Sequence, residues 1–596
     1  MPRPRFSDTR IGKTAVEAGL LLVLPLFFSR SFAEQFSYPK KVLAEILVMG
    51  AASAWVLGAV WGEFPRRRRC RLAWPLALLI LATLVSCLNS PVPAFSLREA
   101  VYFLCGPVWV LVLACGFRID GEAGVRRLYA LCALGGAAVA LIAVLQWSGY
   151  DPLLFGGFRV NWGGMVARMR LYATLGNPNF VAGYLVATVF AAAGLAAVSE
   201  SRRAQVAWGA AVAIMLAALV GAGSRGAWLG LAMGLVAAAL ALKGGPEPRT
   251  GARPMASPES SFPKLRSMAA LACLAALPSG WGDLVNAGLR HVEGRVFLWR
   301  AAWPMFRDHP LLGSGWATFQ LRFLDLQASY LAVHPEMARH WSNIRQLHND
   351  LFQLLLETGL LGLLAFGWVL WVYARQVHPA EPSTRSTRLW LAASAGGITA
   401  ILVDSFVNFQ FAIPPTFILL FTLIAIPELL ANRETPPVVN PPPRRWPWVL
   451  RLATSLVVVA GAVLLLVQIA RDAVAERDYA LATQLENRGE LARAEESYRH
   501  GIQSNPLNGR LHFGLARVLY LADRYPEALG EIPLAERTYV DSHMEVLKGR
   551  IQDEMGLGPA ALESYRRALA LDPTLKTVQA DIERLSKQRA PTFPNP

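Results

Sequence analysis

The sequence predicts an all-α protein in two parts, a polytopic transmembrane helical bundle followed by a soluble helical-repeat tail. Three observations support this prediction. Of the 596 residues, 54% are hydrophobic and only 17% are charged, a balance that places most of the chain in lipid. Long apolar runs recur up to about residue 470, and a repeat of 33–34 residues follows them. The chain is also too long for one compact domain.

Thirteen apolar runs are predicted to cross the membrane. Several are near the minimum of roughly 17–20 residues for a spanning helix, so we expect about 12–13 spans. The first run has a basic start like a signal peptide, but it carries Glu17 and lacks a clean A-x-A site, which favours an uncleaved helix. The runs are 14–32, 42–62, 72–89, 99–117, 128–148, 173–198, 204–222, 226–242, 267–282, 351–373, 389–411, 413–430 and 447–470.

Clusters of Lys and Arg fall on alternate sides of these crossings and set the expected orientation. All are cytoplasmic if the amino terminus is inside, whereas intervening loops such as 90–98 and 412–415 are poor in positive charge. With thirteen crossings, everything after residue 470 then lies outside, in the periplasm if the cell has two membranes. The clusters are the amino terminus, 66–69, 126–127, 202–203, 243–266, 375–388 and 444–445.

The net charge of +16 does not indicate nucleic-acid binding, because much of the basic excess lies in these short clusters. The six Cys are scattered, with no CxxC pair and no Cys/His ligand spacing. We therefore expect no disulfide framework, no metal site and no cofactor.

Two segments on the expected outer side depart from the charge pattern. The first, 149–172, holds Arg170, and the second, 283–347, is far longer than a connecting loop and is rich in Arg and His. A solvated loop is the plain alternative, since long translocated loops escape the charge rule. We favour a functional loop, because ordered loops of this length are usually functional and arginines beside a membrane suit phosphate or pyrophosphate.

The tail repeats itself. Ala494, Ala528 and Ala561 recur at intervals of 34 and 33 residues, and Pro506 and Pro573 close the first and third units. This period is typical of tetratricopeptide repeats, which generally offer a concave surface to another protein. A stabilising appendage is the alternative. The expected organisation is a membrane domain at 1–434, a Pro-rich linker at 435–446, a last transmembrane helix at 447–470 and the repeats at 471–590.

Two short motifs stand at predicted outer helix starts. In LGNPNFVAGYL, Asn177 suits a helix cap, which explains most of the segment and leaves Asn177 and Asn179 a supporting role in substrate binding. In GAGSRGAWLG, Arg225 lies at the outer boundary between glycines. Arg225 could snorkel to the lipid headgroups, but the unhindered backbone and the nearby helix start favour an anion site.

Two further motifs come from the long outer loop and the crossing after it. GRVFLWRAAWPMFRDHPLLGSGWATF is spaced as an amphipathic helix ending at a Pro/Gly turn, with Arg295 at its start and Arg300 further along, and one of its arginines is expected to bind phosphate. In LHNDLFQLLLETGLLGLLAFGWVL, His348 and Asn349 precede a crossing and Glu357 lies inside it. An ionisable residue at that depth normally marks function or a polar partner. A lone His in a loop is more often incidental, but this one lies at the membrane surface beside the Arg-rich loop.

The succession NPNF…GSRGAW…GRVFLW…DHPLLGSGWATF…HNDLFQLLLETGLLGLL resembles the O-antigen ligase/O-antigen polymerase superfamily, over roughly residues 15–430 and most strongly over 171–366. The resemblance implies a GT-C-like bundle and a glycosyltransferase that takes a glycan from an undecaprenyl-pyrophosphate carrier at the outer face of the inner membrane. Members include ligases that use lipid A-core, polymerases that extend lipid-linked repeats and transferases that pass oligosaccharide to protein. The repeat tail is an addition to the smaller ligases.

The resemblance also implies roles for individual residues. Arg225 and Arg295 would stabilise the charge on the leaving pyrophosphate, and His348 would deprotonate the acceptor hydroxyl, so these three are the expected catalytic residues. Direct attack would invert the anomeric centre without a metal. The expected substrate-binding residues are Arg300, Arg170, Asn177, Asn179, Asn349 and Glu357.

Other functions are consistent with the same sequence. A polymerase and a protein O-oligosaccharyltransferase are alternatives of the same class, with a slight preference for the ligase. An alternative of another class is a non-enzymatic membrane-anchored scaffold for envelope assembly, in which Arg225 and His348 tolerate substitution but deletion of 475–596 abolishes function. A transporter is less favoured, because no matching pair of interrupted helices with midplane charges is apparent. The expected partners are the lipid-linked donor, a lipid A-core, glycan or protein acceptor, membrane lipids and a protein bound by the tail, without nucleic acid.

Overall fold

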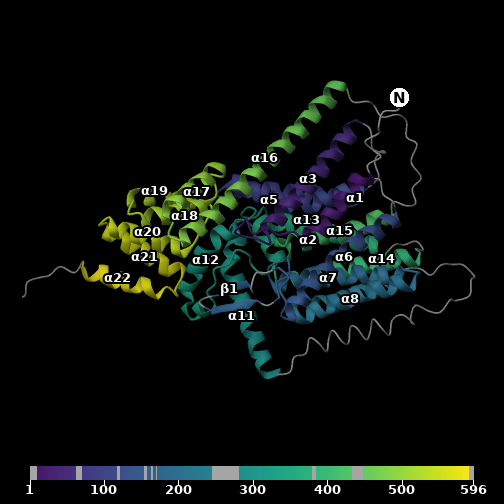
Figure 1. Cartoon of the computed structure of the whole chain (residues 1–596), viewed down its shortest axis with the longest axis horizontal. Coiled ribbons are helices and arrows are strands. Elements are labelled where there is room, and N and C mark those ends of the chain that lie inside the picture. Colours follow the sequence, from purple (N-terminus) through teal and green to yellow (C-terminus); the bar gives the residue numbers. More distant parts are fainter. Residues whose placement is uncertain are drawn as a thin grey trace, which may run out of the picture.

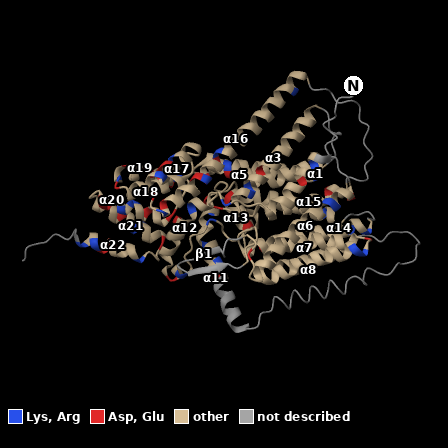
Figure 2. Cartoon of the chain, in the orientation of Figure 1, with Lys and Arg blue, Asp and Glu red and all other residues tan. Residues whose placement is uncertain are grey.

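The protein is mostly helical, as its composition predicts. In the computed structural model, the tail lies at one end of the longest axis and the membrane-type helices lie at the other (Figure 1). Charged residues are sparse along those helices and gather at the helix ends and in the tail (Figure 2). The structure describes residues 10–61, 70–116, 121–153, 158–162, 165–169, 171–243, 281–378, 384–431 and 447–588.

Ten helices among the described residues are long and apolar enough to cross a membrane. They confirm the prediction of a multi-pass membrane protein. They are α3 (Tyr38–Trp61), α5 with its continuation η4 (Pro93–Gly116), α6 (Glu122–Trp147), α7 (Pro178–Val198), α8 (Arg202–Ala222), α9 (Arg225–Lys243), α13 (Asp350–Val377), α14 (Arg385–Ser405), α15 (Pro414–Ala431) and α16 (Trp448–Asn487).

Three of the thirteen predicted crossings are missing from these ten. The predicted crossing at 267–282 lies outside the described residues, apart from its end. The other two are helical, but each is shorter than any of these ten helices. They are the first run, which forms α1 (Arg10–Ala18), η2 (Gly19–Val23) and α2 (Leu24–Leu26), and the third run, which forms α4 (Ala73–Ser86) and η3 (Cys87–Asn89).

Helix α15 is the centre of the bundle. Every residue from Pro414 to Leu430 is buried, and the helix packs against α5, α6, α13 and α14. Such burial on all sides explains why its sequence is apolar all round. Around this centre, α14 packs along α9 and α7, where small residues permit close approach: a Cβ on Gly234 would lie 2.6 Å from the carbonyl oxygen of Gly396.

Polar contacts mark the two ends of the bundle. At one end, Arg127 Nε pairs with Glu17 at 2.7 Å. At the other, Lys40 Nζ donates to the carbonyl oxygens of Phe36 and Thr174 at 2.8 and 2.6 Å. Helices α7, α9, α13 and α15 begin at this second end, which we call the site end. The loops that are expected on the outer side of the membrane therefore lie together at the site end.

Between α9 and α13 the chain leaves the bundle and forms α11 (Trp281–Asp308), α12 (Phe319–Val333) and η6 (Pro335–His340). Buried side chains of α11, including Phe297 and Met305, join a small core with α12 and the start of α13. The predicted amphipathic helix is present and ends at Asp308, but it begins at Trp281, so Arg295 lies within the helix and not at its start. Much of its apolar face is covered by protein.

One element departs from the all-α prediction. An antiparallel hairpin of β1 (Phe158–Trp162) and β2 (Met165–Met169) lies in the segment 149–172. Its sequence, FRVNWGGMVARM, places apolar and β-favouring residues on both sides of a Gly-Gly pair, which is a hairpin signal. This signal is short, and the all-α prediction rested on the helical patterns of the rest of the chain.

The tail is an array of helices in which α16 packs on α17, α18 on α19 and α20 on α21. Ala494, Ala528 and Ala561 are fully buried, in α17, α19 and α21. Helix α16 is continuous from the membrane-type segment into the tail. The remaining helices are α17 (Leu491–Ser504), α18 (Gly509–Leu521), α19 (Tyr525–Glu536), α20 (Ser542–Glu554), α21 (Gly558–Leu571) and α22 (Lys576–Gln588).

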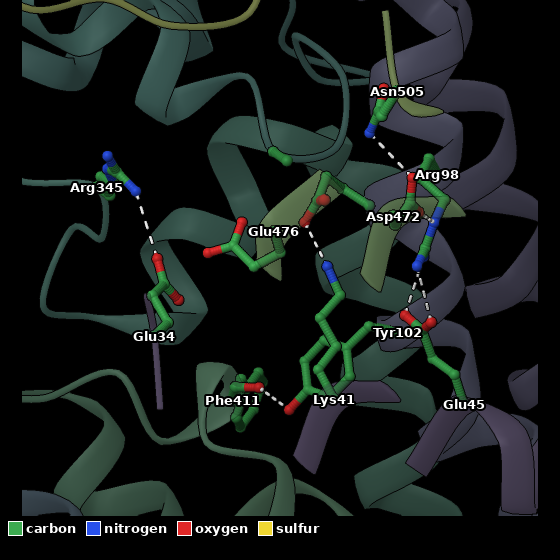
Figure 3. A network of polar contacts seen from close by, with 12 residues as sticks. Glu34, Lys41, Glu45, Arg98, Tyr102, Arg345, Phe411, Asp472, Glu476 and Asn505 are labelled. Atoms are coloured by element: carbon green, nitrogen blue, oxygen red, sulfur yellow. Dashed lines mark hydrogen bonds and ion pairs between the residues drawn. The ribbon is translucent and has the colours of Figure 1, made fainter. Parts of the chain in front are cut away.

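Ion pairs join the tail to the bundle at the site end, and Figure 3 shows this junction. Arg98 of α5 contacts Asp472 of α16 at 2.5 Å and both carboxylate oxygens of Glu45 at 3.0 Å. Asn505 of the tail donates to Asp472 at 2.9 Å. Glu45 is fully buried and Asp472 nearly so, and each has a close partner for its charge.

A second contact involves the loop before α13. Glu34 pairs with Arg345 of that loop at 3.5 Å and with Arg510 of the tail at 3.6 Å. Further along, the indole of Trp341 donates to the carbonyl of Leu571 at 2.7 Å. The tail therefore lies directly against the long loop at 283–347, on the side of the molecule where the site is expected.

Candidate active site

The two glycine-containing motifs, DHPLLGSG and ETG, bond to each other. Helix α13 is broken at Gly359, whose φ of 66° and ψ of −169° are not helical. The break frees the N–H groups of Leu360 and Leu361, which donate to the carbonyls of Pro310 and Leu311 at 2.9 and 3.1 Å. A Cβ on Gly359 would lie 2.4 Å from the Leu311 backbone, so glycine is required there. These bonds anchor the long loop at 283–347 to α13.

Glu357 lies just before this break and is buried. Its carboxylate accepts hydrogen bonds from the backbone N–H groups of Ala317 at 2.9 Å and Phe319 at 3.3 Å. Gln353 donates to the same carboxylate at 3.2 Å and accepts from the N–H of Leu347 at 3.0 Å. Glu357 thus connects the start of α12 to the segment before α13. These hydrogen-bond partners explain how a carboxylate can be buried inside an apolar helix. The role of Glu357 in binding substrate stays a prediction.

His348 has a φ of 56°, a conformation that few non-glycine residues adopt. Asn349 caps α13 by accepting from the N–H of Phe352 at 3.0 Å, which fixes this turn. The imidazole lies edge-on to Phe409, with 4.9 Å between ring centroids. Burial, and secondly the charge of Arg295, lower the pKa of His348 to about 4. The imidazole is therefore neutral at neutral pH and can accept a proton.

Asp404 lies near Arg295, which in turn lies near His348, and we call these three residues the His348 cluster. No sequence motif singled out Asp404. Asn408 and Gln410 donate to its carboxylate at 2.7 and 2.5 Å. Burial lowers the pKa of Arg295, and the charge of Asp404 opposes this effect, which places the two side chains near each other. A Cβ on Gly226 would lie 2.4 Å from Asp404 Oδ1. Helices α9, α11 and α14 and the start of α13 therefore meet at this point.

Arg225 is the first residue of α9, next to the glycine that contacts Asp404. Gly223, with a φ of 63°, ends α8 and makes the tight turn into α9. The Arg225 side chain is exposed at the site end, whereas the Ser224 hydroxyl is buried without a hydrogen-bond partner in the described part of the chain. Unpaired N–H groups at a helix start and a guanidinium together suit an anion.

The remaining predicted site residues are placed as follows. Asn177 caps α7 by accepting from the N–H of Asn179 at 2.9 Å, as its motif predicts. The carbonyl of Asn179 lies 3.5 Å from the Gln410 amide that also holds Asp404, so this motif borders the cluster. Arg300 is exposed on α11. Arg170 lies outside the described residues. Roles for these residues in binding substrate stay predictions.

The fold and this cluster define a multi-pass membrane protein with a polar, cation-containing site at one end of its bundle. Residues 210–367 match the family model described as O-Antigen ligase. The match covers about a quarter of the chain, includes Arg225, Arg295 and His348, and ends before Asp404. It supports an O-antigen-ligase-type membrane protein with a glycosyltransferase-like ligase role, and implies a lipid-linked glycan and an acceptor as partners in general. The search of curated proteins finds no match to this chain.

Proposed function

We propose that this protein transfers a glycan from an undecaprenyl-pyrophosphate carrier to an acceptor hydroxyl at the outer face of the bacterial inner membrane. The observation that carries the proposal is the position of a neutral His348 beside Arg295, with Arg225 at a neighbouring helix start. A proton acceptor next to cations that suit phosphate is what glycosyl transfer from a pyrophosphate requires. The family match over the same residues supports this chemistry.

In the proposed reaction, the acceptor oxygen attacks the anomeric carbon of the first donor sugar. The bond between that carbon and the phosphate oxygen breaks, and its electron pair leaves with the lipid pyrophosphate. The proton of the acceptor hydroxyl moves to a ring nitrogen of His348. Arg225 and Arg295 stabilise the charge that develops on the pyrophosphate. Direct attack inverts the anomeric centre.

Donor binding also strengthens the proposed base. In the free protein, the positive charge of Arg295 contributes to the low pKa of His348. Pyrophosphate bound to Arg295 would offset this charge, and nearby negative charge favours the protonated imidazole. His348 therefore becomes a better proton acceptor when the donor is in place.

The tail completes the proposal. We propose that it is a tetratricopeptide array in the periplasm, after the membrane domain at 1–434, the linker at 435–446 and the last crossing at 447–470. The buried alanines at the repeat interval and the continuity of α16 at the site end support this assignment.

The test is an analysis of envelope glycans in a deletion strain that carries the wild-type chain or His348→Ala. We expect the variant, at normal abundance in the membrane, to behave like the deletion. Full-length polymer stranded on the carrier lipid would identify a ligase, and single repeat units already joined to the acceptor would identify a polymerase. Normal glycans with His348→Ala would show that His348 is not the base.

A further inference from the structure

A cavity of about 260 Å³ lies where the tail meets the outer loop. Gln320 of α12 and residues 343–345 line one side. Residues 538–541, between α19 and α20, line the other. Neither side contains a residue of the His348 cluster, so this cavity is separate from the candidate catalytic site.

Hydrogen bonds fix both walls of this cavity. In the loop, the N–H of Ser342 donates to Gln327 of α12 at 3.1 Å. In the tail, the hydroxyl of Tyr539 donates to Asp541 at 2.9 Å. Across the cavity, the guanidinium of Arg345 lies over the Tyr539 ring, 5.6 Å from its centroid. The walls are therefore preformed, as ligand sites usually are.

The chemistry of the lining favours a neutral, hydroxyl-rich ligand. The charge of Arg345 is paired with Glu34 at 3.5 Å, and Asp541 caps α20 by accepting from a backbone N–H. The side-chain amides of Gln320 and Asn343 have no hydrogen-bond partner in the part of the chain that the structure describes. Each amide offers both donors and an acceptor, which match neighbouring sugar hydroxyls. An anion is not favoured, because the charge of Arg345 is already paired.

The cavity is also close to the proposed base. Arg345 precedes His348 by three residues, and a chain spans at most about 3.3–3.6 Å per residue, so their Cα atoms are within roughly 11 Å. The bond from Leu347 to Gln353 holds the segment between them. A sugar in the cavity would thus lie beside the segment that carries His348.

We propose that this cavity binds a neutral sugar of the acceptor glycan, so that the tail forms one wall of the acceptor site. This inference rests on the proposed function. It assigns the acceptor rather than the donor, because the donor pyrophosphate is assigned to Arg225 at the start of α9 and Arg295 within α11, whereas the cavity is at the tail. Acceptor recognition then requires both parts of the chain.

Transfer kinetics of the full chain in lipid nanodiscs test the proposal, with the lipid-linked donor and acceptor of the host strain varied separately. We expect Asn343→Ala in the loop and Tyr539→Ala in the tail each to raise the acceptor KM about tenfold, with kcat and the donor KM unchanged. Gln503→Ala, an exposed residue of α17 outside the cavity, is the matched control and should change nothing.

Three results would overturn the proposal. A raised donor KM would place the donor glycan in the cavity. A lower kcat with an unchanged acceptor KM would mean that the loop only positions His348. Unchanged kinetics in both cavity variants would mean that no sugar binds there.

A binding measurement separates this proposal from the proposed function. The probe is the acceptor glycan of the host, released from its own lipid by mild acid, and saturation-transfer NMR records its contact with the full chain carrying His348→Ala. We expect binding that Asn343→Ala weakens. If this holds but the wild-type chain transfers nothing, the proposed function fails and the cavity assignment remains. If transfer depends on His348 but Asn343→Ala leaves binding unchanged, the cavity assignment fails alone.

Discussion

Two groups of arginines at the site end differ in their surroundings. At the junction, Arg98 lies 2.5–3.0 Å from the carboxylates of Glu45 and Asp472. At the candidate site, Arg225 and Arg295 have no ion pair within the described part of the chain. Paired buried charges fix parts of a protein to each other, whereas unpaired cations are available to an anionic ligand. We therefore expect junction substitutions to lower stability and site substitutions to lower the rate.

The largest expected effect, and the first way to break this comparison, is His348→Ala. Loss of a general base lowers kcat by roughly 10²–10⁴-fold. Transfer by the purified chain in nanodiscs measures it. His334→Ala removes a half-exposed histidine of the long loop at 283–347 and should leave kcat unchanged. A drop in thermal stability that accounts for the lost activity would instead assign His348 a structural role.

Next in size is Arg98→Ala at the junction. The substitution removes the guanidinium that bonds to the buried carboxylates of both Glu45 and Asp472, which costs about 3–5 kcal/mol of stability. Thermal unfolding in detergent and protease sensitivity between bundle and tail report the loss. Arg493→Ala removes an exposed pair with Glu490 and should cost less than about 1 kcal/mol. Equal losses in the two variants would show that the junction pair is no stronger than a surface pair.

Arg295→Lys sharpens the comparison from the site. A lysine keeps the charge but loses the planar fork that binds phosphate through two hydrogen bonds, and we expect kcat to fall about a hundredfold with stability unchanged. Arg307→Lys, an exposed position near the end of the same helix, is the control. If both variants keep full activity, the cation at Arg295 acts only through its charge or does not act.

Much of the architecture could be predicted from the sequence, because its signals are local. Apolar runs of spanning length mark the crossings, and the repeat interval places Ala494, Ala528 and Ala561 at equivalent buried positions. The cap at Asn177 follows from its motif in the same way. Glu357 stood out as an expensive buried charge, and its polar partners are indeed present.

The rest depends on contacts between distant segments. Asp404 lies in an apolar run and gains meaning only because folding brings Arg295 and Gly226 to it. The break at Gly359 depends on its pairing with the segment at 310–315. The cavity between loop and tail likewise requires two segments almost two hundred residues apart. Composition and periodicity carry no information about such pairings.

The smallest expected effect is a difference between two pH profiles. A histidine whose pKa is about 4 is protonated only near and below that pH, so kcat/KM, which reports the free protein, should stay level from pH 7 and fall only near pH 4. In the donor complex, pyrophosphate offsets the charge of Arg295, so the acid limb of kcat should lie about one pH unit or more higher. Arg510→Gln, at the junction, should move neither limb. If kcat and kcat/KM fall at the same pH, Arg295 does not set the pKa of His348. The two groups of arginines would then not differ in the way proposed.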